Sequence, residues 1–251
     1  MNAVECRDVV KSFGEPPLVV LKSLNFSIEK GEFTGITGRS GSGKSTLLYV
    51  MSGLDDLSSG SILLAGRDIT EFSDREMHVF RNRNMGFVFQ FHYLLPELTA
   101  LENILMPARK FKLEQKKRDY ALSLMESFEV IHCRDKIPSK MSGGEMQRTA
   151  VARALVMQPD ILFADEPTGT LDPETAKLVH QMLLEAARKN AMGMVVTSHF
   201  SQVIEDMANR AILLADGEIA AIGAPKKIIS TFAKDYQKIE ESAPPEIGDI
   251  M

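Results

Sequence analysis

A phosphate-binding loop near the N-terminus constrains the fold of this chain more than any other feature. The loop runs from Gly38 to Ser45 and reads Gly-Arg-Ser-Gly-Ser-Gly-Lys-Ser. Its glycines let main-chain N–H groups turn inward and approach phosphates closely, and the following helix directs its positive end at the same charge. Residues 33–37 predict a buried strand, and residues 45–51 predict a helix. This order of elements predicts a nucleotide-binding α/β fold.

The loop supplies most of the candidate ATP-binding residues. Lys44 is expected to reach the outer phosphates, and Ser45 to place its hydroxyl on Mg²⁺, so ATP and Mg²⁺ are the expected cofactors. A Gly/Ser-rich loop without a ligand is the alternative, which the flanking strand and helix disfavour. The full set of expected contacts is Gly38, Arg39, Ser40, Gly41, Ser42, Gly43, Lys44, Ser45 and Thr46.

The composition is that of an ordinary globular protein. The 251 residues are 44% hydrophobic and 25% charged, which allows one large domain or two small ones with a real core. The net charge of −5 argues against nucleic acid as the main partner. Cys6 and Cys133 lack metal-ligand spacing and indicate a reducing compartment. The N-terminus does not read as a signal peptide, and no run approaches the roughly 18 apolar residues of a membrane span. Work at a membrane is therefore expected to need a partner.

The chain divides into three parts by their patterning. Residues 3–65 are rich in alternating, strand-like segments, and residues 91–158 carry mostly helical spacing. Strands and helices alternate again over 161–214, which predicts a parallel sheet with helices on its faces. We expect one domain over residues 1–239, with the helical part inserted into its core. Residues 240–251 contain acids and two prolines and are expected to form a mobile tail.

A second nucleotide motif follows the helical part. The apolar strand that begins at Ile161 ends in two adjacent acids, Asp165 and Glu166. Strand ends in α/β sheets face the ligand crevice, so Asp165 is expected near the Mg²⁺ beside Ser45. Glu166 is expected to polarise the water that attacks the terminal phosphate. Two acids in a plain turn are the alternative.

A third motif, Ser142-Gly143-Gly144-Glu145, predicts another anion cradle. A serine and two glycines at a helix start offer free N–H groups, a hydroxyl and a positive dipole end. One nucleotide cannot use both cradles if they lie on opposite sides of one subunit. A two-fold dimer in which each cradle closes over the partner's ATP is the simplest solution. A Gly-rich turn with a helix cap is the alternative.

These motifs together resemble the ATP-binding-cassette family, over about residues 3–230. The resemblance implies an α/β fold: a P-loop NTPase RecA-like core with an antiparallel β subdomain and an inserted α-helical subdomain. It further implies ATP hydrolysis by a homodimer that drives integral-membrane permease subunits. Met141 and Glu145 stand where many members have Leu and Gln.

Four further positions gain roles from this resemblance. Phe13 lies where members stack an aromatic ring on adenine, with Phe in place of the commoner Tyr. Gln90 matches the glutamine that senses Mg²⁺ and the attacking water. Asp172 belongs to the loop that crosses the dimer. His199 matches the histidine that contacts the terminal phosphate, which makes it a third catalytic candidate beside Glu166 and Gln90.

The segment from Gln90 to Asn103 resembles the ATPase subunit of bacterial lipoprotein-releasing systems, within the macrolide-exporter branch. That resemblance implies a peripheral protein on the cytoplasmic face of the inner membrane, whose permease extracts or exports lipoproteins or other amphiphiles. Export of drugs or toxins, control of cell-wall hydrolases, and a soluble ATPase without transport are the alternatives. A groove for a permease helix, or ordinary packing, is expected from Leu94, Leu95, Pro96 and Leu98.

Overall fold

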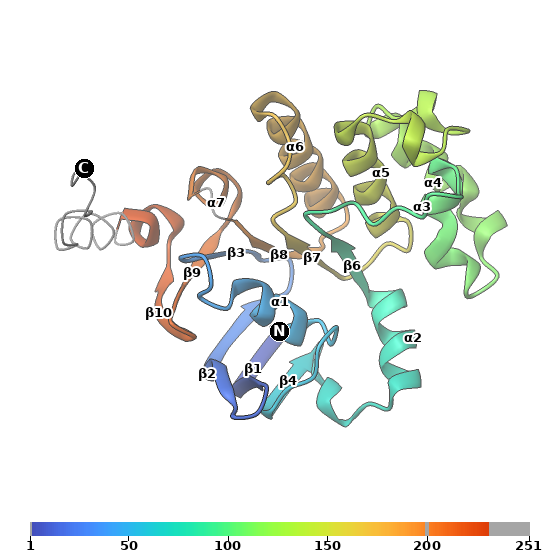
Figure 1. Ribbon diagram of the computed structural model, residues 1–251. Helices are drawn as coiled ribbons and strands as arrows, with labels where there is room; N and C mark the ends of the chain where they lie inside the picture. Colours follow the sequence, from blue (N-terminus) through green and yellow to red (C-terminus); the bar gives the residue numbers. More distant parts are fainter. Residues whose placement is uncertain (1, 199–200, 231–251) are drawn as a thin grey trace, which may run out of the picture.

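A six-stranded sheet forms the centre of the molecule, and the computed structural model describes residues 2–198 and 201–230 around it (Figure 1). The strand order is β10-β9-β3-β8-β7-β6, and all neighbours are parallel except the antiparallel pair of β9 and β10. The strands are β3 (Phe33–Thr37), β6 (Met85–Val88), β7 (Ile161–Asp165), β8 (Gly193–Thr197), β9 (Arg210–Ala215) and β10 (Glu218–Gly223).

A second, antiparallel sheet has the strand order β2-β1-β4-β5. Its strands are β1 (Asn2–Phe13), β2 (Leu18–Glu29), β4 (Ser59–Leu64) and β5 (Arg67–Asp68). Helix α1 (Lys44–Met51) lies between the two sheets and buries Leu47, Leu48 and Met51 there (Figure 1). The helix that follows the phosphate-binding loop is therefore held by apolar packing on both sides.

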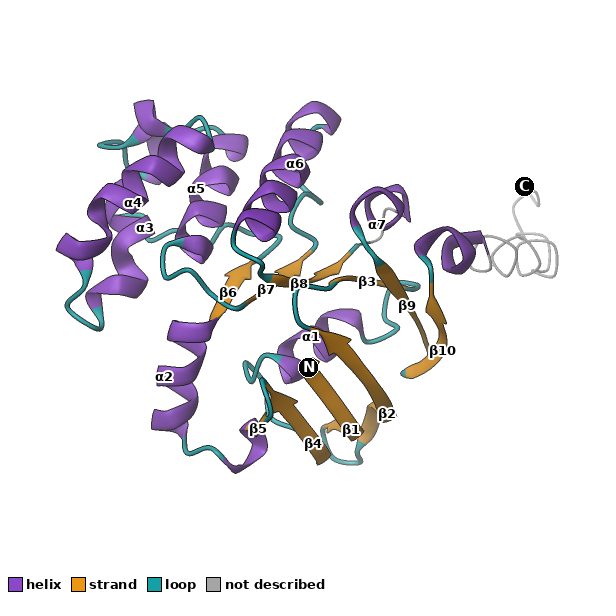
Figure 2. Cartoon of the chain, turned by 180° about the vertical axis from the view of Figure 1, so that it is seen from behind, coloured by secondary structure: helices purple, strands orange, loops and turns teal. Residues whose placement is uncertain are grey.

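The remaining long helices cover the opposite face of the six-stranded sheet (Figure 2). They are α3 (Ala100–Arg109), α4 (Glu114–Ser127), α5 (Gly143–Leu155), α6 (Pro173–Lys189) and α7 (Ser201–Met207). Helix α2 (Asp74–Asn84) runs from the antiparallel sheet to β6, and short 3-10 turns occupy Ile69–Glu71, Ile131–Cys133 and Pro138–Lys140. Helices α3 to α5 lie within the range 91–158 that the sequence predicts to be helical.

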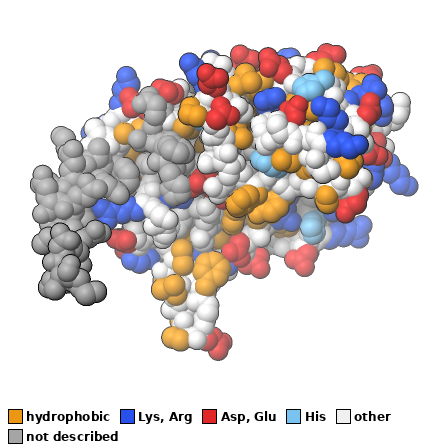
Figure 3. Space-filling model, turned by 45° about the horizontal axis from the view of Figure 1, so that its top comes forward, with side chains coloured by type: hydrophobic (Ala, Val, Ile, Leu, Met, Phe, Trp, Pro, Cys, Tyr) orange, Lys and Arg blue, Asp and Glu red, His pale blue; other side chains and the backbone are white. Residues whose placement is uncertain are grey.

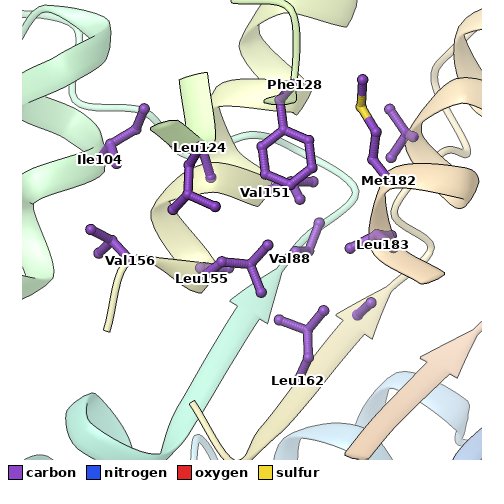
Figure 4. Packing of buried hydrophobic residues seen from close by; sticks show 14 of the residues in the cluster. Val88, Ile104, Leu124, Phe128, Val151, Leu155, Val156, Leu162, Met182 and Leu183 are labelled. Carbon is purple, nitrogen blue, oxygen red and sulfur yellow. The ribbon is translucent and has the colours of Figure 1, made fainter. Parts of the chain in front are cut away.

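The alternation of side chains along β7 separates two hydrophobic clusters. Ile161 and Phe163 pack with α1 and the antiparallel sheet, whereas Leu162 packs with the helices on the other face. Figure 4 shows Val88 beside Leu155 of α5 and Leu162 below both, with other helices around them. Burial on both faces explains why the central strands read as continuous apolar runs.

The predicted fold class is confirmed, but helix α2 and the strands β5, β6 and β10 were not predicted from the sequence. Helix α2 buries none of its residues, so it lacks apolar periodicity, and only its capping box from Ser73 and Glu76 marks its start. Strand β10 is a short, half-exposed edge strand. The predicted domain limits stay predictions, and residues 240–251 lie outside the described ranges.

The surface mixes charges of both signs. Figure 3 shows Lys and Arg side chains interspersed with Asp and Glu over the face that it draws. Within residues 2–198 and 201–230, none of the helices combines the length and apolar character that crossing a bilayer requires.

Candidate functional site

The phosphate-binding loop connects the end of β3 to α1 in a tightly constrained turn. A side chain at Gly38 (φ 152°) would place its Cβ 2.1 Å from the carbonyl oxygen of Leu214, so only glycine fits. The Lys44 ammonium donates to the carbonyls of Gly38 at 3.0 Å and Arg39 at 2.8 Å. Burial lowers the pKa of Lys44, and the carboxylates of Glu166 and Asp165 oppose this effect. The lysine therefore stands beside the acids of the second motif.

The loop fits a phosphate group. Among the described residues, no side chain caps α1 at Gly43, so the first amides of the helix keep unpaired N–H groups. The buried hydroxyl of Ser42 also has no hydrogen-bond partner within the described part of the chain. Arg39, Ser40 and Gly41 are exposed at the loop tip, and Thr46 is half-buried in the first turn of α1. Free donors around a lysine are what an anionic ligand requires.

Asp165 is the centre of a buried cluster of hydroxyl groups. Its Oδ1 accepts hydrogen bonds from Ser45 at 2.9 Å and Thr197 at 2.6 Å, and its Oδ2 accepts one from Tyr49 at 2.8 Å. Burial and the bond to Asp165 raise the pKa of Tyr49. The structure thus brings Ser45 and Asp165 together as predicted, and their oxygen atoms suit the ligand preference of Mg²⁺.

Glu166 adopts a left-handed backbone conformation with φ of 45°. Its N–H donates to the main-chain oxygen of Thr197 at 3.2 Å and to the Thr197 hydroxyl at 3.1 Å. Such a conformation is uncommon for a residue with a side chain and persists where the surroundings hold it. The main chain therefore leaves the regular path of β7 at Glu166.

Gly169 shows that Gln90 and Glu166 are close neighbours. A Cβ on Gly169 would lie 3.2 Å from the Nε2 of Gln90 and 3.5 Å from the Oε2 of Glu166. The structure therefore gathers Gln90, Glu166, Asp165 and Lys44 at one end of the six-stranded sheet, although they come from three separate segments.

Of the two remaining predicted contacts, one is exposed at the surface and the other lies outside the described residues. Phe13 ends β1 with 44% of its surface exposed, and the Lys11 ammonium lies 4.5 Å from its ring centroid. An exposed ring face is available for stacking. His199 lies outside the described residues.

Ser142 and Glu145 cap the start of α5. The Ser142 N–H donates to the Glu145 carboxylate at 2.7 Å, and the Glu145 N–H donates to the Ser142 hydroxyl at 3.2 Å. His132 contacts the other Glu145 oxygen at 2.6 Å. Hydrogen bonds from Ser142 and His132 lower the pKa of Glu145 to about 2. Ser142 and Gly143 are exposed, while Gly144 packs against Thr175 of α6.

Within one copy, the structure does not bring this second cradle to the phosphate-binding loop. Helix α1 lies on one face of the six-stranded sheet and α5 on the other, as Figures 1 and 2 both show. Asp172 starts α6 near the second cradle, where it accepts hydrogen bonds from the N–H groups of Glu174 at 3.1 Å and Thr175 at 3.0 Å.

The Glu145 carboxylate supports a pH-dependent prediction. Its folded pKa of about 2 lies below the ordinary 4.5, so its contribution to stability is complete above about pH 4.5 and is lost as the pH falls toward 2. We expect Glu145→Gln to lower the free energy of unfolding by about 1–2 kcal/mol at pH 5, after allowance for solvent screening. Urea denaturation of both proteins at pH 5 and pH 3 measures this. A difference that fails to shrink at pH 3 contradicts the assignment.

Two residues of the Asp165 cluster were missed in the sequence. Tyr49 follows Ser45 by four positions on α1, a spacing that places both side chains on one face, and this signal was available. Thr197 ends the buried strand β8 next to β7, and the parallel pairing of Asp165 with Thr197 brings the two side chains together.

A buried asparagine holds the predicted docking segment against α3. Buried Asn103 of α3 accepts from the Leu95 N–H at 2.7 Å and donates to the carbonyls of Leu95, Leu98 and Thr99. The hollow beside this segment is lined by other side chains, of which Tyr93 is the one from the predicted stretch. Asn103 thus holds the loop of Leu95 and Leu98 against α3. The role expected of Leu94, Leu95, Pro96 and Leu98, as a groove for a permease helix or as ordinary packing, stays a prediction.

Comparison with known proteins assigns the chain to a family. The sequence model of the ABC transporter family matches residues 21–169. A lipoprotein-releasing system ATP-binding protein of Leptospira interrogans is 42% identical over 92% of this chain and 97% of its own length. One from Geobacter metallireducens is 41% identical over 88% and 99%. A solved dimeric, post-hydrolysis ATP-binding cassette bound to ADP and Pi matches with a TM-score of 0.79 at 34% identity, over 88% of this chain and 98% of that one. The chain therefore belongs to the ABC transporter family, as a subunit that binds and hydrolyses ATP.

Proposed function

We propose that this chain is the ATPase subunit of a lipoprotein-releasing transporter, at the cytoplasmic face of the inner membrane. The observation that carries the proposal is an apolar hollow beside the segment after Gln90. A membrane subunit bound in this hollow would move with the segment when ATP is hydrolysed. The cargo class comes from the relatives, which are ATP-binding proteins of lipoprotein-releasing systems at 41–42% identity.

In this proposal, hydrolysis depends on positioning and electrostatics. Lys44 and the loop amides hold the phosphates, and Glu166 accepts a proton from the attacking water. Ser45, Asp165 and Gln90 are the residues that would hold Mg²⁺, which when bound neutralises charge on the phosphates. The 2.9 Å contact between Ser45 and Asp165 supports this ligand set.

The working form is a dimer in which each copy completes the other's site. The partner's phosphate-binding loop holds an ATP that is contacted by Ser142, Gly143 and Gly144 of the first copy. Asp172 lies at the interface between the two copies. The exposure of Ser142 and Gly143 supports this arrangement, as does the separation of α1 and α5 by the sheet. The dimeric cassette with ADP and Pi provides a precedent.

The hollow has a volume of about 370 Å³ and suits an amphipathic helix of the permease. Tyr93 at its edge is 65% exposed, and Met106 of α3 is 38% exposed. The buried Oδ1 of Asn82 has no hydrogen-bond partner among the described residues, so it favours a partner that brings a donor. The lining residues are Leu54, His78, Arg81, Asn82, Met85, Gly86, Phe87, Phe89, Tyr93, Met106, Pro107, Lys110, Arg153, Ala154 and Met157.

Substitution within the hollow tests this function. We expect Met106→Glu to abolish co-purification with the permease subunits. Removing a carboxylate from water in an apolar interface lowers the binding free energy of the complex by several kcal/mol. Leu18→Glu, at a more exposed leucine on β2, is the matched control and should keep the complex. In proteoliposomes, the complex with the original chain should release a lipoprotein only with ATP. Retention of the Met106→Glu complex, or ATP turnover without lipoprotein release, would contradict the proposal.

A further inference from the structure

Gln147 is a fully buried polar residue of α5 that joins three separate segments. Its side-chain nitrogen donates to the main-chain carbonyl of Phe89 at 3.2 Å and to that of Pro167. Its side-chain oxygen contacts the Nδ1 of His92 at 2.6 Å. The amide therefore uses both of its hydrogens and one oxygen in a region that excludes water.

The orientation of this amide follows from its partners. Two carbonyl oxygens can only accept, so the nitrogen of Gln147 must face them and its oxygen must face His92. The Nδ1 of His92 must then carry the hydrogen. Arg153, also on α5, reinforces the contact by donating to the carbonyls of His92 at 2.7 Å and Tyr93 at 2.6 Å.

The two carbonyls flank the two groups proposed to act on the attacking water. Phe89 directly precedes Gln90, and Pro167 directly follows Glu166. The side chains of Gln90 and Glu166 approach each other across Gly169. A single amide thus sets the distance between the two turns that carry these groups, and it does so from the helix that begins at Ser142.

We propose that Gln147 is a positioning residue for ATP hydrolysis, which holds the Gln90 segment and the Glu166 turn in register with α5. This inference rests on the roles proposed above for Gln90 and Glu166. Gln147 transmits a shift of α5, which carries Ser142 at its start, to the turn of Glu166. Gln147 also connects the Glu166 turn to the hollow, because Phe89, Tyr93 and Arg153 line the hollow.

Steady-state hydrolysis by the full chain with ATP and Mg²⁺ tests the inference. Gln147→Met preserves length and removes the amide, and we expect it to lower kcat by about 10- to 100-fold because the catalytic groups lose their spacing. The KM for ATP should stay within about twofold, since Gln147 is buried away from the loop. Gln181→Met, an exposed glutamine on α6, is the matched control and should keep the original kcat.

A second pair of variants tests the same inference if Gln147→Met fails to fold. His92→Leu removes only the donor to Gln147 and should lower kcat, whereas His92→Asn retains a donor at a similar position and should restore it. A purely structural role predicts equal kcat for both. If Glu166→Gln is inactive while Gln147→Met and His92→Leu both turn over at the original rate, this inference fails alone. If Glu166→Gln remains active, the proposed catalytic roles fail instead.

Discussion

Replacement of Glu166 by Gln is expected to lower the rate of ATP hydrolysis by about 10²- to 10³-fold while ATP still binds. The amide keeps the shape of the side chain but cannot accept a proton from water, and general-base catalysis has this magnitude. The backbone of residue 166 should stay in place, because Thr197 holds its N–H through two contacts. Phosphate release under saturating ATP measures the effect.

The same variant should accumulate as a dimer with ATP bound. Hydrolysis separates the two copies in the proposed cycle, so blocking it leaves them closed. Size-exclusion chromatography with and without ATP reports this shift. Glu185→Gln, the same substitution at an exposed position of α6, is the control and should hydrolyse ATP normally. Undiminished phosphate release by Glu166→Gln would overturn the assignment of the base.

Replacement of Lys44 by Ala is expected to weaken nucleotide binding by about 30- to 150-fold, which corresponds to the roughly 2–3 kcal/mol of a hydrogen bond with a charged group. The ammonium lies among loop carbonyls beside Asp165 and Glu166, so its loss also removes one positive charge between those acids and the phosphates. Isothermal titration calorimetry with ATP measures the affinity.

Lys116→Ala, at an exposed lysine of α4, is the matched control for Lys44→Ala and should leave the affinity unchanged. Thermal denaturation should show that the Lys44 variant is folded. Affinity equal to that of the original chain would remove Lys44 from the binding site and would contradict the proposed use of the loop.

Local signals in the sequence were enough to predict the elements that carry the site. The loop glycines and Lys44 predicted the strand, turn and helix, and Ser142 followed by Gly143 and Gly144 predicted the start of α5. Such signals succeed because a cap or a glycine turn is decided by residues a few positions apart.

Other parts of the fold depend on contacts that no short segment contains. Helix α2 has no buried residue, so the apolar spacing that predicts helices is missing. Tyr49 reaches Asp165 across 116 positions of the chain, and Gln147 reaches Phe89 across 58. The sheet order brings these residues together, and that order could not be predicted from local patterns.

The structure of Glu166→Gln with ATP and Mg²⁺ tests the central claim most directly. We expect a closed dimer in which the Ser142 hydroxyl lies at hydrogen-bond distance, about 2.7–3.0 Å, from a phosphate held by the partner's loop. A closed dimer in which Ser142 is remote from every phosphate, or touches the nucleotide of its own copy, would contradict it.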